Sequence, residues 1–188
     1  MKNVMIVGVG GQGSLLASRI LGALFLNENL EVKMSEVHGM AQRGGSVVTY
    51  VRAGTDVASP LISEGEADVI ISFEELEAMR YVSWLKKDGT IVVNTQQINP
   101  MPVLTGAAKY PENIIENLRA KSIDVVAFDA LDAAMKAGNT KAANVALLGA
   151  AAKVIGYDKE AWIEAMKATI APKFLEMNLK AFDFGYNC

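Results

Sequence analysis

A glycine-rich segment near the N-terminus has the residue types and spacing of a phosphate-binding turn. Gly8-Val9-Gly10-Gly11-Gln12-Gly13 matches G-x-G-x-x-G. It follows a short apolar run, Val4–Val7, and from Ser14 onward the apolar residues take helical spacing. Glycines at such a turn let a phosphate approach backbone N–H groups, and the start of the helix adds a favourable field. Glu36 stands roughly where a dinucleotide-binding fold keeps its ribose-binding acid. Two interpretations stay open: a phosphate site, or glycines needed only for a tight turn.

A second segment, residues 35–46, holds the only histidine of the chain, His38, together with Arg43. Arg43 offers a planar, permanent positive charge suited to phosphate or carboxylate. Gly44-Gly45 can form a backbone concavity for an anion. Less specific interpretations remain for both side chains, since His38 could satisfy a loop carbonyl and Arg43 could form a salt bridge. Neutral hydrogen-bonding side chains in this segment include Gln42 and Ser46.

Strands and helices are expected to alternate along the chain and to position these two segments. Helical periodicity is expected from Ser14, over Glu74–Leu85, Pro111–Ala120 and Asn144–Ile155, after Asp158, and from Pro172 until just before Gly185. Six segments are predicted as strands, several of them short apolar runs: Val4–Val7, Leu30–Glu36, Val47–Val51, Val69–Ser72, Thr90–Val93 and Ile123–Phe128. This pattern predicts an α/β fold with a mainly parallel sheet, helices on both of its faces and a helical C-terminal third.

The predicted sheet brings the candidate residues to one edge. The first two strands are joined by a helix and should run in the same direction, so their carboxyl ends share an edge. Residues 94–97 should join them if the fifth strand is also parallel. No residue is predicted to be catalytic or to bind a metal. The predicted cofactor-binding residues are Gly10, Gly11, Gln12, Gly13, His38, Gln42, Arg43, Gly44, Gly45, Ser46 and Asn94.

Composition excludes several classes of function. The 188 residues suit a single domain, and a net charge of −3 gives no electrostatic reason to expect nucleic acid or an anionic membrane as partner. A single cysteine, Cys188, cannot hold an iron–sulfur cluster, and one histidine makes a zinc site or a Ser–His–Asp hydrolase hard to build. Glycines break the apolar run after Lys2, so neither a signal peptide nor a membrane span is expected, and the cytoplasm is the expected location.

The chain resembles the gamma domain of pyruvate/2-oxoacid:ferredoxin oxidoreductases, and within that family the beta subunits of indolepyruvate:ferredoxin oxidoreductases. The resemblance rests on the glycine segment, on Ser35–Val47, and on Asn94-Thr95-Gln96-Gln97-Ile98, Tyr110-Pro111 and Gly138–Asn144 with Leu148-Gly149. It covers essentially the whole chain, so residues 1–188 are expected to form a single gamma-type domain. The string Glu-Val-His-Gly-Met-Ala-Gln-Arg-Gly-Gly is highly specific, whereas the glycine segment alone is not.

The resemblance implies an accessory subunit of an enzyme complex. Such complexes convert a 2-oxoacid and coenzyme A to an acyl-CoA and carbon dioxide, and they reduce ferredoxin. Thiamine diphosphate and iron–sulfur clusters would lie in a large catalytic (alpha) subunit, and this chain would carry no cofactor and show no activity alone. An isolated subunit would expose an apolar patch and could form a homodimer. The alternatives are a gamma subunit acting on pyruvate or another 2-oxoacid, a free-standing NAD- or FAD-binding oxidoreductase, and a structural module without a ligand.

Overall fold

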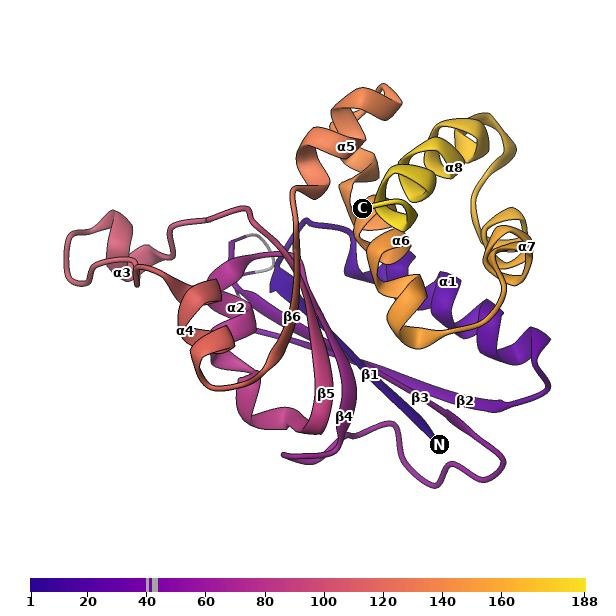
Figure 1. The fold of residues 1–188 in the computed structure, drawn as a ribbon, viewed down its shortest axis with the longest axis horizontal. Coiled ribbons are helices and arrows are strands. Elements are labelled where there is room, and N and C mark those ends of the chain that lie inside the picture. The colour runs from indigo at the N-terminus through magenta and orange to yellow at the C-terminus, as the bar shows by residue number, and fades with distance from the viewer. Residues whose placement is uncertain (40, 42–43) are drawn as a thin grey trace.

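The computed structural model describes residues 1–39, 41 and 44–188, and its centre is a six-stranded sheet (Figure 1). All six expected strands form, several of them longer than the apolar runs that predicted them. Their order in the sheet is β2-β3-β1-β4-β5-β6. Their bounds are β1 Lys2–Val9, β2 Glu31–His38, β3 Ser46–Gly54, β4 Ala67–Ser72, β5 Leu85–Asn94 and β6 Asp124–Phe128.

The sheet is mainly parallel, as the sequence predicts, with one strand reversed. β1, β4, β5 and β6 pair in parallel. β3 pairs antiparallel with β1 and with β2. β1 and β2 therefore run in the same direction, as expected, but β3 lies between them. Their carboxyl ends still reach the same edge of the sheet.

Helices cover both faces of the sheet because side chains alternate along each buried strand. On β1, Val4 and Ile6 face one core while Met5 and Val7 face the other. The first core lies under five helices, α1 Ser14–Asn27, α5 Ala130–Ala137, α6 Ala143–Ile155, α7 Lys159–Thr169 and α8 Pro172–Tyr186. The second lies under α2 Glu75–Arg80, the 3₁₀ turn η1 Val82–Trp84 and α4 Ile114–Ala120. The short elements α3 Met101–Leu104 and η2 Thr140–Ala142 complete the set.

Three helix boundaries differ from the expected ones. The helix expected over Glu74–Leu85 ends at Arg80, because Tyr81 and Trp84 turn the chain through η1 and Leu85 already belongs to β5. α4 starts at Ile114 rather than Pro111, after Asn113 in a left-handed conformation. Gly185 was expected to follow the last helix, and instead it lies inside α8.

Gly185 is needed for helix packing rather than for ending a helix. A Cβ atom at Gly185 would lie 1.8 Å from the carbonyl oxygen of Ala146, and one at Gly149 would lie 2.1 Å from that of Phe182. The backbones of α6 and α8 can therefore approach closely only because both positions are glycine. This contact fixes the helical C-terminal third over one face of the sheet (Figure 1).

Candidate functional site

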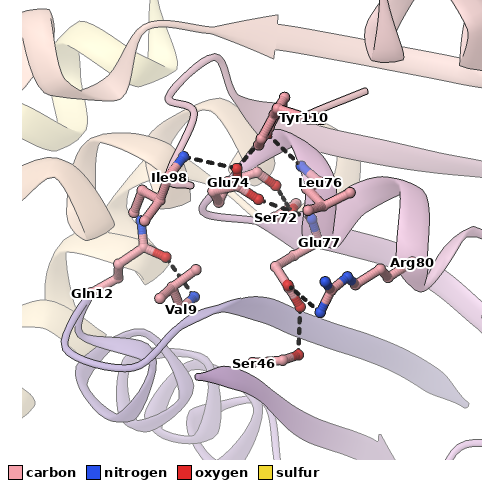
Figure 2. Close-up of polar contacts among 10 residues, drawn as sticks. All are labelled: Val9, Gln12, Ser46, Ser72, Glu74, Leu76, Glu77, Arg80, Ile98 and Tyr110. Carbon is pink, nitrogen blue, oxygen red and sulfur yellow. Dashed lines mark hydrogen bonds and ion pairs between the residues drawn. The ribbon is translucent and has the colours of Figure 1, made fainter. Parts of the chain in front are cut away.

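The side chain of Gln12 fixes the glycine loop, Gly8–Gly13, onto the ends of two strands. Its Oε1 accepts a hydrogen bond from Val9 N at 2.7 Å (Figure 2). Its Nε2 donates to the carbonyl of Phe73, the residue after β4, at 3.0 Å. One neutral amide thus satisfies a donor on its own loop and an acceptor on the neighbouring strand end.

Gly13 begins helix α1 in a conformation that favours glycine, with φ +89°. The amide of Asn144, at the start of α6, donates to Gly13 O at 3.1 Å. A Cβ atom at Gly13 would lie 2.5 Å from that amide nitrogen. Glycine is therefore required at position 13 for two reasons, the positive φ angle and the close approach of the Asn144 side chain.

Gly44 and Gly45, at the end of the second loop (residues 39–45), lie directly against the glycine loop, as the strand directions led us to expect. Gly10 N donates to Gly45 O at 2.9 Å, and Gly44 N donates to Gly10 O at 3.4 Å. Gln42 and Arg43, two of the predicted binding residues, lie outside the described residues.

A pocket of about 340 Å³ opens on one side of the glycine loop, and we name it the Glu36 pocket. The Oε2 atom of Glu36 accepts hydrogen bonds from the hydroxyls of Ser14, at 2.8 Å, and Thr49, at 3.0 Å. His38 is exposed, and its Nδ1 lies 3.1 Å from the carbonyl oxygen of Gly39, so the ring meets a loop carbonyl. The lining residues are Gly10, Gly11, Gly13, Ser14, Leu15, Glu36, His38 and Val47.

A second pocket, of about 450 Å³, opens on the other side of the loop, and we name it the amide pocket. Asn94 lies at the end of β5, where its amide donates to Phe73 O at 3.2 Å and its Oδ1 accepts from Ala130 N at 3.1 Å. Lys141 brings a positive charge from η2. The lining residues are Gly11, Gln12, Gly13, Phe73, Asn94, Gln96, Leu131, Thr140, Lys141, Ala143, Asn144 and Leu147.

The two pockets differ in the charge that they favour. The Glu36 pocket contains a carboxylate, which repels an anion at short range. The amide pocket is lined by neutral amides and by Lys141, beside the start of α1, where the helix dipole favours negative charge. The predicted binding residues divide accordingly: Gly10 and His38 line the first pocket, Gln12 and Asn94 the second, and Gly11 and Gly13 both.

Ser46, another predicted binding residue, is engaged elsewhere. Its hydroxyl donates to the carboxylate of Glu77 on α2, and Glu77 also pairs with Arg80 at 3.3 Å (Figure 2). Glu77 is 3% exposed, and burial raises the pKa of its carboxyl group against the opposing effects of Ser46 and Arg80. Burial also raises the pKa of Glu75. Ser46 therefore ties the end of the second loop to α2.

Sequence reasoning missed two groups of residues at this edge. Lys141 and Asn144 stood in the Gly138–Asn144 string, but nothing in their spacing placed them against the glycine loop, which lies far away in the sequence. Glu74, Glu75 and Glu77 were assigned only to a predicted helix, Glu74–Leu85, and the structure shows that all three are buried. Their only sequence signal was the position of Glu74 just after a buried strand.

Residues 1–39, 41 and 44–188 contain no helix that is both long enough and apolar enough to cross a bilayer. Within the same ranges, no three His, Cys, Asp or Glu side chains gather in a way that could hold a metal ion.

Comparison with known proteins gives matches over nearly the whole chain. The model of the family "Pyruvate ferredoxin/flavodoxin oxidoreductase" matches residues 3–188. The chain is 42% identical to the indolepyruvate oxidoreductase subunit IorB of Thermococcus kodakarensis, over 97% of this chain and 93% of that protein. It is 28% identical to the pyruvate/ketoisovalerate oxidoreductases common subunit gamma of the same organism, over 100% of this chain and 96% of that protein.

Solved structures share the fold at lower identity. The gamma subunit of a keto/oxoacid ferredoxin oxidoreductase from Geobacter sulfurreducens superposes with a TM-score of 0.71 at 24% identity, over 100% of this chain and 97% of that one. The pyruvate oxidoreductase subunit PORC of Thermotoga maritima gives 0.73 at 22% identity, over 99% and 95%. The 2-oxoglutarate:ferredoxin oxidoreductase of Magnetococcus marinus gives 0.69 at 19% identity, over 99% of this chain and 30% of that one.

Proposed function

Because the chain belongs to the pyruvate ferredoxin/flavodoxin oxidoreductase family, we propose that it is the accessory (beta) subunit of an indolepyruvate:ferredoxin oxidoreductase. The observation that carries the proposal is the full-length identity of 42% to an indolepyruvate oxidoreductase subunit, against 28% to a pyruvate/ketoisovalerate subunit gamma. The complex would oxidatively decarboxylate an aryl 2-oxoacid to its acyl-CoA, with release of carbon dioxide and transfer of the electrons to ferredoxin. The gamma subunit of a pyruvate-type complex is the second candidate.

The proposal divides the chemistry between two chains. The cysteine content of this one, Cys188 alone and exposed, does not fit an iron–sulfur cluster, which needs several thiolate ligands. The clusters and the thiamine diphosphate would belong to the large catalytic subunit. This chain would then be inactive alone, and its role in the complex would be to bind and orient an anionic group, as described next. The cytoplasmic location stays a prediction.

We assign the binding work to the glycine loop and the amide pocket. Backbone N–H groups at the start of α1 and the charge of Lys141 suit an anion such as a phosphate of coenzyme A. A carboxylate of the partner subunit is the other anion that could occupy this place. The pocket also lies outside the carboxyl ends of the strands, between loops whose helices α1 and α2 go to opposite faces of the sheet. Ligands of open α/β sheets bind at such a point.

The Glu36 pocket gives less support to a free-standing dinucleotide oxidoreductase. The Oε2 atom of Glu36 already accepts two protein hydroxyls, so only Oε1 is left to receive a ribose hydroxyl. The strand next to β1 is the antiparallel β3, whereas a dinucleotide fold has its parallel second strand there. Purification of the isolated chain separates the alternatives, since bound nicotinamide or flavin would favour the dinucleotide interpretation.

The test is reconstitution of the complex from this chain and its large subunit. We expect coenzyme A-dependent reduction of ferredoxin with arylpyruvates, faster than with pyruvate, and no turnover by the chain alone. Activity of the isolated chain, or a preference for pyruvate, would contradict the proposal. Light scattering of the isolated chain tests the expected homodimer, which a strictly monomeric protein at high concentration would exclude.

Arg43 tests the binding role of the second loop in the same complex. Arg43→Ala should raise the apparent coenzyme A requirement by about 10- to 100-fold or weaken subunit association similarly, because a charge-assisted hydrogen bond contributes roughly 1.5–3 kcal/mol. Arg43→Lys should restore only part of the effect, since a point charge does not reproduce the planar guanidinium. If Arg43→Ala changes neither quantity, the loop is a structural turn.

A further inference from the structure

A short arm, residues 98–110, leaves the sheet edge after β5 and stands clear of the other helices and strands (Figure 1). Residues 95–108 contain no charged side chain. At the tip, Met101 is 67% exposed and Leu104 is 66% exposed. A projecting loop that only met water would gain nothing from large apolar side chains at its tip, and exposed apolar groups gathered together mark interaction sites.

The tip of the arm is ordered by its own hydrogen bonds. The carbonyl of Pro100 accepts from Val103 N at 2.9 Å and from Leu104 N at 3.0 Å. The hydroxyl of Thr105 donates to Met101 O at 3.0 Å. Two prolines, Pro100 and Pro102, restrict the chain further. The tip therefore presents Met101 and Leu104 in a preformed turn, which lowers the entropy cost of binding.

The base of the arm is held by one buried carboxylate. Glu74 is 1% exposed, and its Oε1 accepts from Ile98 N at 3.0 Å on one leg and from the Tyr110 hydroxyl on the other (Figure 2). Burial, followed by the hydrogen bond to Glu74, raises the pKa of Tyr110, so the phenol stays a donor at physiological pH. A single side chain thus joins both legs of the arm to α2.

The arm is continuous with the candidate site. Gln96, just before the arm, lines the amide pocket, and its carbonyl accepts from Glu75 N at 3.2 Å. Gln96 and Met101 are five residues apart, so a partner that holds the tip of the arm lies within about 20 Å of the amide pocket. In the proposed complex, the large catalytic subunit has to reach that pocket. A second copy bound to the arm would occupy the same edge of the sheet and block that access.

We propose that the arm is the docking element for the large catalytic subunit, with Met101 and Leu104 seated in an apolar, uncharged recess of that subunit. This inference rests on the proposed function. The absence of charge on residues 95–108 makes the contact an apolar one, so that this part of the association depends little on salt concentration.

The test measures binding of the full chain to the purified large subunit. The double variant Met101→Asp and Leu104→Asp should weaken the affinity by at least about 100-fold, as expected when two central apolar anchors become charged. Both side chains are exposed in the free chain, so its thermal unfolding should not change. Leu61→Asp is the matched control, because Leu61 is also in a loop and 56% exposed but lies at the opposite edge of the sheet; it should bind as the wild type does.

Two results would overturn the docking role of the arm. One is an affinity of the double variant equal to that of Leu61→Asp. The other is loss of self-association in the isolated chain with unchanged binding to the large subunit, which would make a second copy the occupant. If instead the wild-type chain does not bind the large subunit at all, it is the proposed function that fails, so the two failures are distinguishable.

Discussion

The glycine loop and the arm leave the same edge of the sheet and are fixed by opposite chemistry. Neutral amides, those of Gln12 and Asn144, hold the glycine loop. Carboxylates hold the arm: Glu74 binds both of its legs, and Glu75 accepts from Gln97 at 2.9 Å. On the side of the amide pocket these amides add no negative charge to the start of α1, whereas Glu36 binds the Ser14 hydroxyl on the other side of the loop. A carboxylate anchor gives a rigid support where no anion has to enter.

The largest expected effect is a loss of stability when the carboxylate that holds the arm is removed. Glu74→Ala removes the acceptor of Ile98 N, of the Tyr110 hydroxyl and of Glu77 N, which is bound at 3.0 Å. Leaving these donors unpaired should lower the free energy of unfolding by about 3 kcal/mol. Denaturant unfolding measures the loss. Glu74→Gln should lose less, because its amide oxygen can still join the two legs while its NH₂ group faces Glu77 N. Equal stability of Glu74→Ala and wild type would contradict the anchor.

Lys141 should matter for the ligand rather than for the fold. In the reconstituted complex, Lys141→Ala should raise the KM for coenzyme A by about 10- to 50-fold through loss of one charge-assisted contact. The unfolding free energy should stay within about 0.5 kcal/mol, as is usual for an exposed side chain. Lys121→Ala, an exposed lysine at the opposite edge, is the control. A KM equal to that of Lys121→Ala would place the anion elsewhere.

Replacing the amide of Gln12 by a carboxylate gives the glycine loop the same kind of anchor as the arm. Gln12→Glu keeps an acceptor for Val9 N but loses the donor to Phe73 O and adds a negative charge to the amide pocket. We expect the KM for coenzyme A to rise about tenfold, with a destabilisation of roughly 1 kcal/mol. Steady-state kinetics and denaturation measure the two effects on one variant. A KM that stays unchanged would mean that the pocket does not receive an anion.

The smallest effect concerns the pH dependence of stability. Burial raises the pKa of Glu77 in the folded chain, so the folded state holds the proton more strongly than the unfolded one. This contribution to stability is fully present below the unfolded pKa and is lost as pH rises through the folded pKa. Glu77→Gln should therefore flatten the fall of the unfolding free energy as pH rises above the ordinary glutamate pKa of about 4.3. Exposed Glu64→Gln should keep the wild-type profile, and a similar profile for both variants would contradict the assignment.

Local sequence patterns determined most of the secondary structure and the placement of the two loops. Six segments were predicted as strands and six strands form; the buried ones among them, such as Val4–Val7 and Val69–Ser72, carry continuous apolar stretches because both faces of the sheet are covered. The glycine motif between Val7 and Ser14 located the turn, since only glycine fits at Gly13 with its positive φ. The common direction of β1 and β2 followed from the helix between them, and Gly44 and Gly45 lie beside the glycine loop as that direction predicts.

The strand that lies next to β1 and the charges around the glycine loop depend on the tertiary structure. The pattern of a strand reports its burial and not its direction, so the insertion of the antiparallel β3 could not be predicted from it. Glu74 binds Tyr110 and Lys141 lines the amide pocket through contacts between segments far apart in the chain. Gly185 is needed where α8 packs against α6. Such contacts depend on packing in three dimensions, because it is packing that buries a carboxylate or brings two backbones together, and no local spacing of residues encodes it.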